Sequence, residues 1–226
     1  TILIAGSLAL AIRWSIAEPF RIPSGSMEPT LRGHPNFLIG DRVFVNKWRY
    51  GLRYPFTRKR IYYGDRPQRW DIVVFRTVEE DASKKTLVKR IAGMPGEHVH
   101  IKGGRLHVNG EPIPFPPDMP EDMYYTNELE MGITGEALRM IGQHEPMRYG
   151  ILPDDEYALV PEGHYFLLGD NSAQSRDGRF WGWVPNDHLL GPVTCIWWPP
   201  LHIRDFTGFT RTWWWRSLIA VLAVLL

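Results

Sequence analysis

Three residues in two short segments carry the side chains that serine-type acyl transfer needs. Ser24 and Ser26 stand one residue apart in a turn where Pro23 and Pro29 restrict the backbone on both sides. Lys89 stands in an otherwise apolar stretch. A serine hydroxyl becomes a good nucleophile only when a base takes its proton, and a neutral lysine amine can be that base. The residue types predict a Ser/Lys pair, with an ordinary turn and a solvated lysine as the alternatives.

Lys89 lies on the apolar face of a predicted strand. Side chains alternate along a strand, so Lys89 shares a face with Leu87 and Ile91, while Arg90 and Val88 point to the other face. Burial disfavours the charged ammonium group and lowers its pKa. Moving that pKa from about 10.4 to the 7–8 useful for a base costs roughly 3–4 kcal/mol. Such a cost points to a function for the neutral amine.

A third segment, residues 167–185, is rich in side chains that form hydrogen bonds and ion pairs. It reads "LLGDNSAQSRDGRFWGWVP", and its polar residues come just before the aromatic group "FWGW". A polar loop held by its own ion pairs is the simplest interpretation. Its candidate polar residues are Asp170, Ser172, Ser175, Arg176, Asp177 and Arg179.

Short strands dominate the chain between the ends. Residues 37–47 and 71–75 have strand patterns, and residues 86–93 complete a hairpin with the latter. With 19 prolines, 21 glycines and 13% aromatic residues, the composition favours many turns over a helical bundle. We expect a mainly β protein with a catalytic body at residues 18–103 and 163–208, and an inserted smaller β-rich subdomain at residues 104–162.

The two ends of the chain are apolar. Residues 1–12 carry no charge, and a membrane span needs about 20 apolar residues. We therefore expect residues 1–17 to be the last part of a transmembrane helix, with a cleaved signal peptide as the rival reading. Residues 213–226 begin with three tryptophans and continue with an apolar run. This segment is either a truncated second membrane helix or an interfacial anchor.

Composition excludes several classes of partner. The net charge of +1 and the absence of a basic cluster argue against nucleic acid. No H-E-x-x-H motif or Cys/His cluster is present, so we expect neither a metal nor a cofactor. The single cysteine, Cys195, lies in a predicted buried strand, and one thiol allows no internal disulfide.

In combination, four segments resemble the sequence boxes of bacterial type I signal peptidases. These are membrane-bound Ser/Lys endopeptidases that remove signal peptides from exported proteins. The segments, in the family's order, are "PSGSMEPTL", "IGDRVFVNK", "LVKRIAGMPGE" and "GDNSAQSRDGRFWG". The resemblance implies the family's β-fold of coiled antiparallel sheets. It also implies a place in the inner (cytoplasmic) membrane, with the catalytic domain on the outer face.

The resemblance assigns roles to four residues. Ser26 becomes the nucleophile, Lys89 the general base, and Ser24 an oxyanion-hole donor beside the Ser26 backbone N–H. Ser175 falls at the family's lysine-orienting serine. Ser172 stands where the family has an arginine, so it is the alternative orienting residue.

Three further positions depart from the family pattern. Gly178 stands where the family has a serine, and Glu97 where it usually has an aspartate. Residues 32–37 lengthen the loop after the proposed nucleophile, and the sequence offers no reason for them.

The family binds its substrate by strand addition, which here places an extended peptide between residues 20–24 and 86–89. Two small pockets would then accept an Ala-x-Ala cleavage site. The partners implied are preprotein signal peptides and membrane lipid. The residues matching the family's pocket are Phe20, Ile22, Met27, Leu31, Val43, Val74, Leu87 and Val88.

Three alternatives stay open. A Ser/His/Asp hydrolase would need one of the histidines, but none lies in a G-x-S-x-G elbow, and His98, His100 and His107 have the pattern of solvent-facing strand residues. SOS-repressor-type self-cleaving proteins share the Ser/Lys dyad, but they require a DNA-binding domain that this chain has no room for. A membrane-tethered β-rich binding module would explain the composition and the anchor without needing Ser26 and Lys89 together.

Overall fold

The computed structural model describes residues 17–36, 38–54, 57, 59–79, 86–130, 132 and 146–208. Within these residues, no helix combines the length and the apolar character needed to cross a bilayer. Both apolar ends of the chain lie outside the described residues, apart from residue 17.

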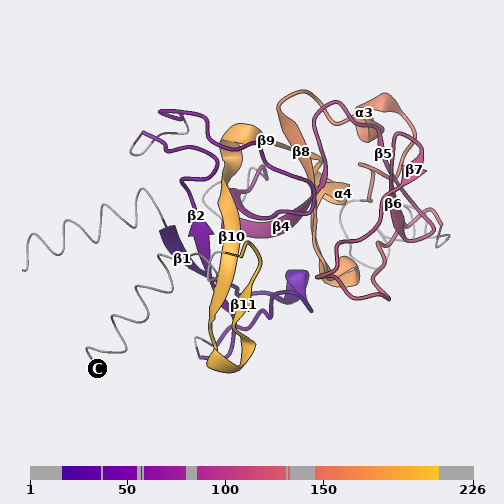
Figure 1. The fold of residues 1–226 in the computed structure, drawn as a ribbon. Coiled ribbons are helices and arrows are strands. Elements are labelled where there is room, and N and C mark those ends of the chain that lie inside the picture. Colours follow the sequence, from indigo (N-terminus) through magenta and orange to yellow (C-terminus); the bar gives the residue numbers. More distant parts are fainter. Residues whose placement is uncertain are drawn as a thin grey trace, which may run out of the picture.

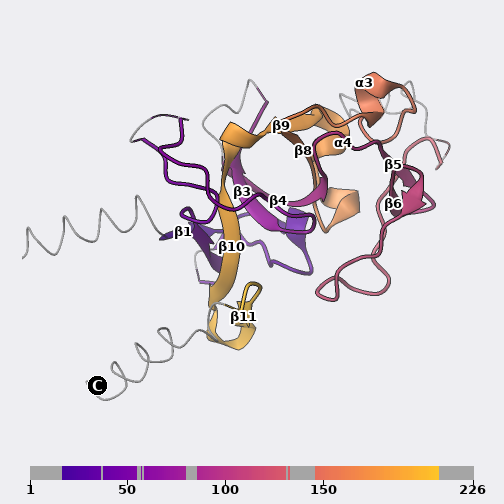
Figure 2. The ribbon, with the colours of Figure 1, turned by 45° about the horizontal axis from the view of Figure 1, so that its top comes forward.

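The largest element is an eight-stranded antiparallel sheet, with strands in the order β1-β2-β10-β3-β4-β8-β9 and β11 added to β10. Figures 1 and 2 show that it curls strongly around its interior. Its strands are β1 (Ala17–Arg21), β2 (Arg42–Asn46), β3 (Ile72–Arg76), β4 (Thr86–Gly93), β8 (His164–Leu168), β9 (Trp183–Pro185), β10 (Leu189–Trp198) and β11 (Arg204–Asp205).

A second, three-stranded antiparallel sheet lies beside the first (Figure 1). It consists of β5 (Val99–Lys102), β6 (Arg105–Val108) and β7 (Glu111–Pro112), with β6 in the middle. Pro112 therefore lies on an edge strand, where a missing N–H does no harm. The boundary expected at residue 104 falls in the turn between β5 and β6, and the division into body and insert stays a prediction.

Short helices connect the strands. They are η1 (Gly25–Met27), α3 (Asp155–Ala158), η3 (Ser172–Gln174), α4 (Gly178–Trp181), η4 (Asn186–His188) and η5 (Pro200–His202).

Several predicted elements are confirmed, and one has different bounds. β3 and β4 form the expected hairpin, in which Val73 stands opposite Lys89. Cys195 is buried in β10, as expected. The strand predicted over residues 37–47 begins only at Arg42. Residues 155–158 form α3, whose first turn carries two acidic residues that favour a helix N-terminus.

Three apolar clusters form the core. The first joins the second sheet to β8 and includes Val99, Ile101, Leu106, Val108, Phe166 and Leu168. The second lies under β1, β2 and η1 and includes Ile22, Met27, Leu31, Val43, Val45 and Val74. The third packs on the other face of β3 and β4 and includes Val73, Phe75, Ile91, Leu167 and Leu189.

Among the strand edges that lack a neighbouring strand in the described residues, two belong to β1 and to the first half of β4. β1 lies at one end of the large sheet, so only one of its edges is paired, with β2. The first half of β4 pairs with β3 alone, because pairing with β8 begins at Arg90. An extended peptide could add to either edge.

Candidate active site

The turn that carries Ser26 is held from two sides. β1 leads into η1, in which Met27 is 1% exposed and anchors the turn in the second apolar cluster. From the other side, Asn171 donates its side-chain amide to the carbonyl oxygen of Gly25 at 3.0 Å. The backbone N–H of Asn171 also donates to the carbonyl oxygen of Ser26, at 3.1 Å. The half-buried Ser26 is therefore fixed in position.

Lys89 reaches this turn from β4. Its side chain is buried, with 3% of the residue exposed, and its Nζ lies 2.5 Å from the Oγ of Ser26. Burial lowers the pKa of Lys89 from 10.5 to about 8, although the carboxylates of Asp177 and Asp170 raise it in part. The structure thus brings together the two residues expected to form the dyad. A substantial share of the amine is neutral near pH 8, as a general base must be.

A buried ion pair lies next to Lys89 in the chain. The guanidinium of Arg90 donates to both carboxylate oxygens of Asp170, with the shortest distance 2.7 Å, and to Asp118 at 3.0 Å. Burial alone would lower the pKa of Arg90, but Asp170 outweighs it and raises that pKa. Asp118 belongs to the Pro-rich segment after β7, so this contact ties that segment to β4.

A second buried ion pair supports the loop around η3. Arg179 and Asp177 are fully buried and 2.9 Å apart. Burial would raise the pKa of Asp177, yet Arg179 lowers it overall. The hydroxyl of Ser172 accepts from Arg179 at 2.7 Å and from the backbone N–H of Thr126 at 2.8 Å. The Ser172 hydroxyl is thus committed to this network, which argues against Ser172 as the residue that orients Lys89.

Ser175 and Ser24 are differently placed. The Oγ of Ser175 is buried and has no hydrogen-bond partner within the part of the chain that the structure describes. A Cβ built on Gly169 would lie 2.1 Å from this Oγ and 2.5 Å from the carbonyl oxygen of Ser26, so Ser175 lies close to the turn. Ser24 is exposed, extended and makes no capping hydrogen bond to η1. Its hydroxyl is free to turn toward a substrate oxygen.

Most of the proposed pocket residues share one cluster. Leu87 is the exception, because it packs against the third cluster on the opposite face of β4. The other candidates line the second cluster, either buried or at its margin: Phe20, Ile22, Met27, Leu31, Val43, Val74 and Val88.

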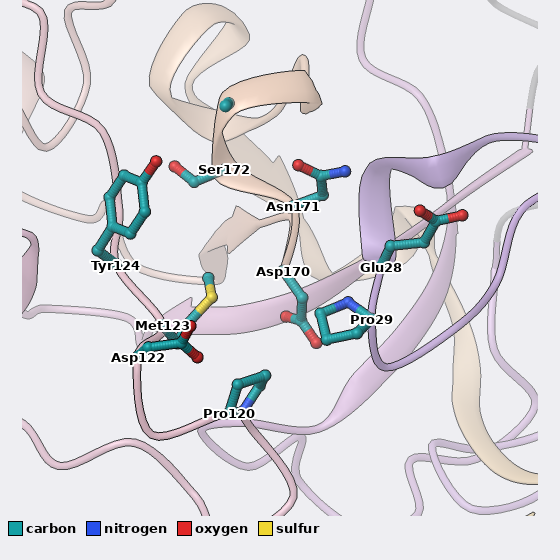
Figure 3. Close-up of a pocket in the computed structure, with 10 residues that line it drawn as sticks. Glu28, Pro29, Pro120, Asp122, Met123, Tyr124, Asp170, Asn171 and Ser172 are labelled. Carbon is teal, nitrogen blue, oxygen red and sulfur yellow. The ribbon is translucent and has the colours of Figure 1, made fainter.

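A cavity of about 350 Å³ opens beside the turn that carries Ser26 (Figure 3). Figure 3 shows Glu28 and Pro29 on one side of this cavity and Tyr124 on the opposite side. Asn171 and Ser172 lie between the two sides. None of the eight proposed pocket residues lines it.

The extra loop packs against the segment that leads to Ser26. A Cβ on Gly33 would lie 1.9 Å from the backbone carbonyl of Ser24, so this close contact requires glycine. The backbone N–H of His34 donates to the carbonyl oxygen of Ile22 at 3.2 Å. Sequence reasoning missed the supporting roles of Gly33, Asn171 and Asp118. Only Asn171 carried a signal, since it stands inside the family segment "GDNSAQSRDGRFWG".

The remaining polar candidates lie elsewhere. His100 and His107 stand opposite each other in the second sheet. His98 is exposed and lies 3.1 Å from Asp155. Among the described residues, no group of three or more His, Cys, Asp or Glu side chains is placed to hold a metal ion.

Comparisons with known proteins identify the family. A model of the signal peptidase family, peptidase S26, matches residues 1–198. A signal peptidase I of Pseudomonas aeruginosa is 36% identical over 90% of this chain and 73% of its own length. That of Pseudomonas fluorescens is 33% identical, with the same coverage. The crystal structure of a signal peptidase I from Enterococcus faecalis V583 has a TM-score of 0.40 at 26% identity, covering 57% of this chain and 98% of that one. The chain therefore belongs to the signal peptidase family, peptidase S26, and is a serine endopeptidase.

Proposed function

We propose that this chain cleaves N-terminal signal peptides from exported preproteins after an Ala-x-Ala-like site, using Ser26 as the nucleophile and Lys89 as the general base. The observation that carries the proposal is the 2.5 Å contact between the Nζ of Lys89 and the Oγ of Ser26. The pKa of Lys89, lowered to about 8 by burial, supports the role of base. The names of the relatives support the substrate class.

The reaction proceeds through an acyl-enzyme. Lys89 takes the proton of the Ser26 hydroxyl as the oxygen attacks the scissile carbonyl. The oxyanion is bound by the backbone N–H of Ser26 and the hydroxyl of Ser24. The protonated amine then gives its proton to the leaving amine of the mature protein. A water molecule, deprotonated by the same amine, hydrolyses the ester and releases the signal peptide.

Substrate binding uses the free strand edges. An extended peptide lies between residues 20–24, which include the end of β1, and the first half of β4, pairing with both. Its alternating side chains then face the second cluster, where small pockets accept alanine at the −1 and −3 positions. Ser175 orients the amine of Lys89 once substrate binds, since its buried hydroxyl is the nearby one not committed to Arg179.

The location follows from the substrate. Signal peptides are presented at the outer surface of the bacterial inner membrane, so residues 1–17 anchor the catalytic body there. Residues 213–226 form a second membrane contact.

The test is cleavage of a preprotein by the purified full chain in nonionic detergent. We expect the wild type to cut after the Ala-x-Ala site, and Ser26→Ala and Lys89→Ala to be inactive. A matched control is Lys102→Ala, which removes an exposed lysine from the second sheet. Near-normal cleavage by Lys89→Ala would refute the dyad, and efficient cutting after Leu or Phe would refute the small pockets.

A further inference from the structure

A second cavity, of about 240 Å³, is lined by positively charged side chains. Lys47, Arg53 and Arg76 all contribute to its wall, together with the hydroxyl-bearing Thr57 and Tyr54. The described residues that line it include no carboxylate. Guanidinium and ammonium groups around one hollow are the groups that proteins use to bind phosphate. The cavity is therefore suited to an anion.

Strand register places this cavity at one particular edge of the large sheet. Ala17, at the start of β1, stands opposite Asn46, at the end of β2. β10 begins at the same edge, where Leu189 stands opposite Phe75, next to Arg76 at the end of β3. The cavity thus lies where the chain enters β1 from residues 1–16.

One ion pair connects the cavity to that entry point directly. The Nζ of Lys47 lies 2.5 Å from a carboxylate oxygen of Glu18, the residue after Ala17. Lys47 is therefore the cation of the wall that lies next to the segment entering β1.

Aromatic side chains surround the same place. Trp48 is 52% exposed and follows Lys47 directly, and Tyr54, in the cavity wall, is 51% exposed. Exposed Trp and Tyr side chains favour the headgroup level of a bilayer. Cations that bind phosphate and aromatics that favour the interface thus occur together.

We propose that this cavity binds the phosphate of an anionic phospholipid headgroup in the membrane that anchors residues 1–17. The inference rests on the membrane location given under the proposed function. Arg76 and Lys47 contact the phosphate oxygens, the Arg53 guanidinium, held by the carbonyl oxygen of Leu189, adds positive charge to the wall, and Trp48 and Tyr54 lie among the neighbouring headgroups. The bound lipid fixes the rotation of the catalytic body about its anchor.

The test measures lipid retention, so it does not depend on proteolysis. The full chain carrying Ser26→Ala is mixed in nonionic detergent with phosphatidylglycerol or phosphatidylcholine, and native mass spectrometry counts the lipids that stay bound. We expect phosphatidylglycerol to be retained in preference. Arg76→Gln should weaken its retention about fivefold, the equivalent of the ~1 kcal/mol that one cation contributes at an anionic membrane surface.

Two matched variants complete the experiment. Lys102→Gln, which removes an exposed cation on the second sheet, should leave retention unchanged, and Arg76→Lys should restore most of it. Equal retention of both lipids, or an unchanged result for Arg76→Gln, would overturn the proposal. Glycerol phosphate that binds as tightly as phosphatidylglycerol would show a site for free anions and overturn the lipid assignment. A wild-type chain that selects phosphatidylglycerol but cleaves no preprotein would refute the proposed function and leave the lipid site standing.

Discussion

Asn171 holds the turn that carries Ser26 by two hydrogen bonds, one from its side chain to Gly25 and one from its backbone to Ser26. We expect Asn171→Asp to lower kcat about tenfold or more, because it replaces the side-chain donor by an anion that repels the carbonyl oxygen of Gly25. KM should change little, since the substrate edges are untouched. Steady-state cleavage of a preprotein measures both. Asn109→Asp, an exposed change in the turn between β6 and β7, is the control, and an equal loss in both variants would contradict the positioning role.

Activity should depend on pH through Lys89. The amine acts as a base only when neutral, and its pKa is lowered to about 8. We therefore expect kcat/KM to rise about tenfold per pH unit below that pKa and to level off above it. A pH–rate profile of the wild type tests this. A profile that is flat through that range would mean that another group is the base.

Lys89 should also lower the stability of the fold. Its pKa is 10.5 before burial and about 8 in the folded chain, so the unfolded chain binds more protons between these values. Stability accordingly rises as pH increases through that window, and the penalty is fully present below it. Lys89→Met should raise the free energy of unfolding by up to about 3 kcal/mol at neutral pH. Urea unfolding of both proteins should show this gain shrinking as the pH approaches 10.5, and a constant gain would argue against it.

Asp170 should contribute strongly to the stability of the fold. Asp170→Ala leaves the buried guanidinium of Arg90 without its main partner, and breaking such a pair costs about 3–5 kcal/mol. Thermal unfolding measures the loss. Asp155→Ala removes an exposed carboxylate paired with His98, and it should cost less than about 1 kcal/mol. Similar losses in the two variants would contradict the argument.

Gly33 should influence catalysis from outside the dyad. Gly33→Ala forces the Ser24 backbone away, because its Cβ would lie 1.9 Å from the carbonyl carbon. If Ser24 is an oxyanion donor, kcat should fall by as much as the about 10²–10³-fold expected for Ser24→Ala. Combining the two substitutions should add little further loss. Full additivity in the double variant would separate Gly33 from the oxyanion hole.

The sequence was informative where one residue type determines the outcome. The alternation around Lys89 predicted its burial, and register confirms that its cross-strand neighbour, Val73, belongs to an apolar cluster. The roles of Ser24, Ser26 and Ser175 come from the resemblance to the family boxes and stay predictions.

Contacts between distant segments could not be predicted in this way. Nothing in the residues near Gly33 indicates that it touches Ser24, and nothing near Asp118 indicates that it reaches Arg90 from beyond the second sheet. Leu87 was assigned to the pocket by its position in a motif. In the structure, Leu87 packs against the third cluster. It lies on the face of β4 opposite to Val88 and the second cluster, because side chains alternate along that strand.

The first apolar cluster is shared between β8 of the large sheet and the small sheet, through Phe166 and Leu168 on one side and Ile101 and Leu106 on the other. A shortened version of this enzyme could not simply lose the small sheet, because the apolar side chains of β8 would then be exposed to water. Evolutionary trimming of this region would have to replace those β8 side chains by polar ones in the same lineage.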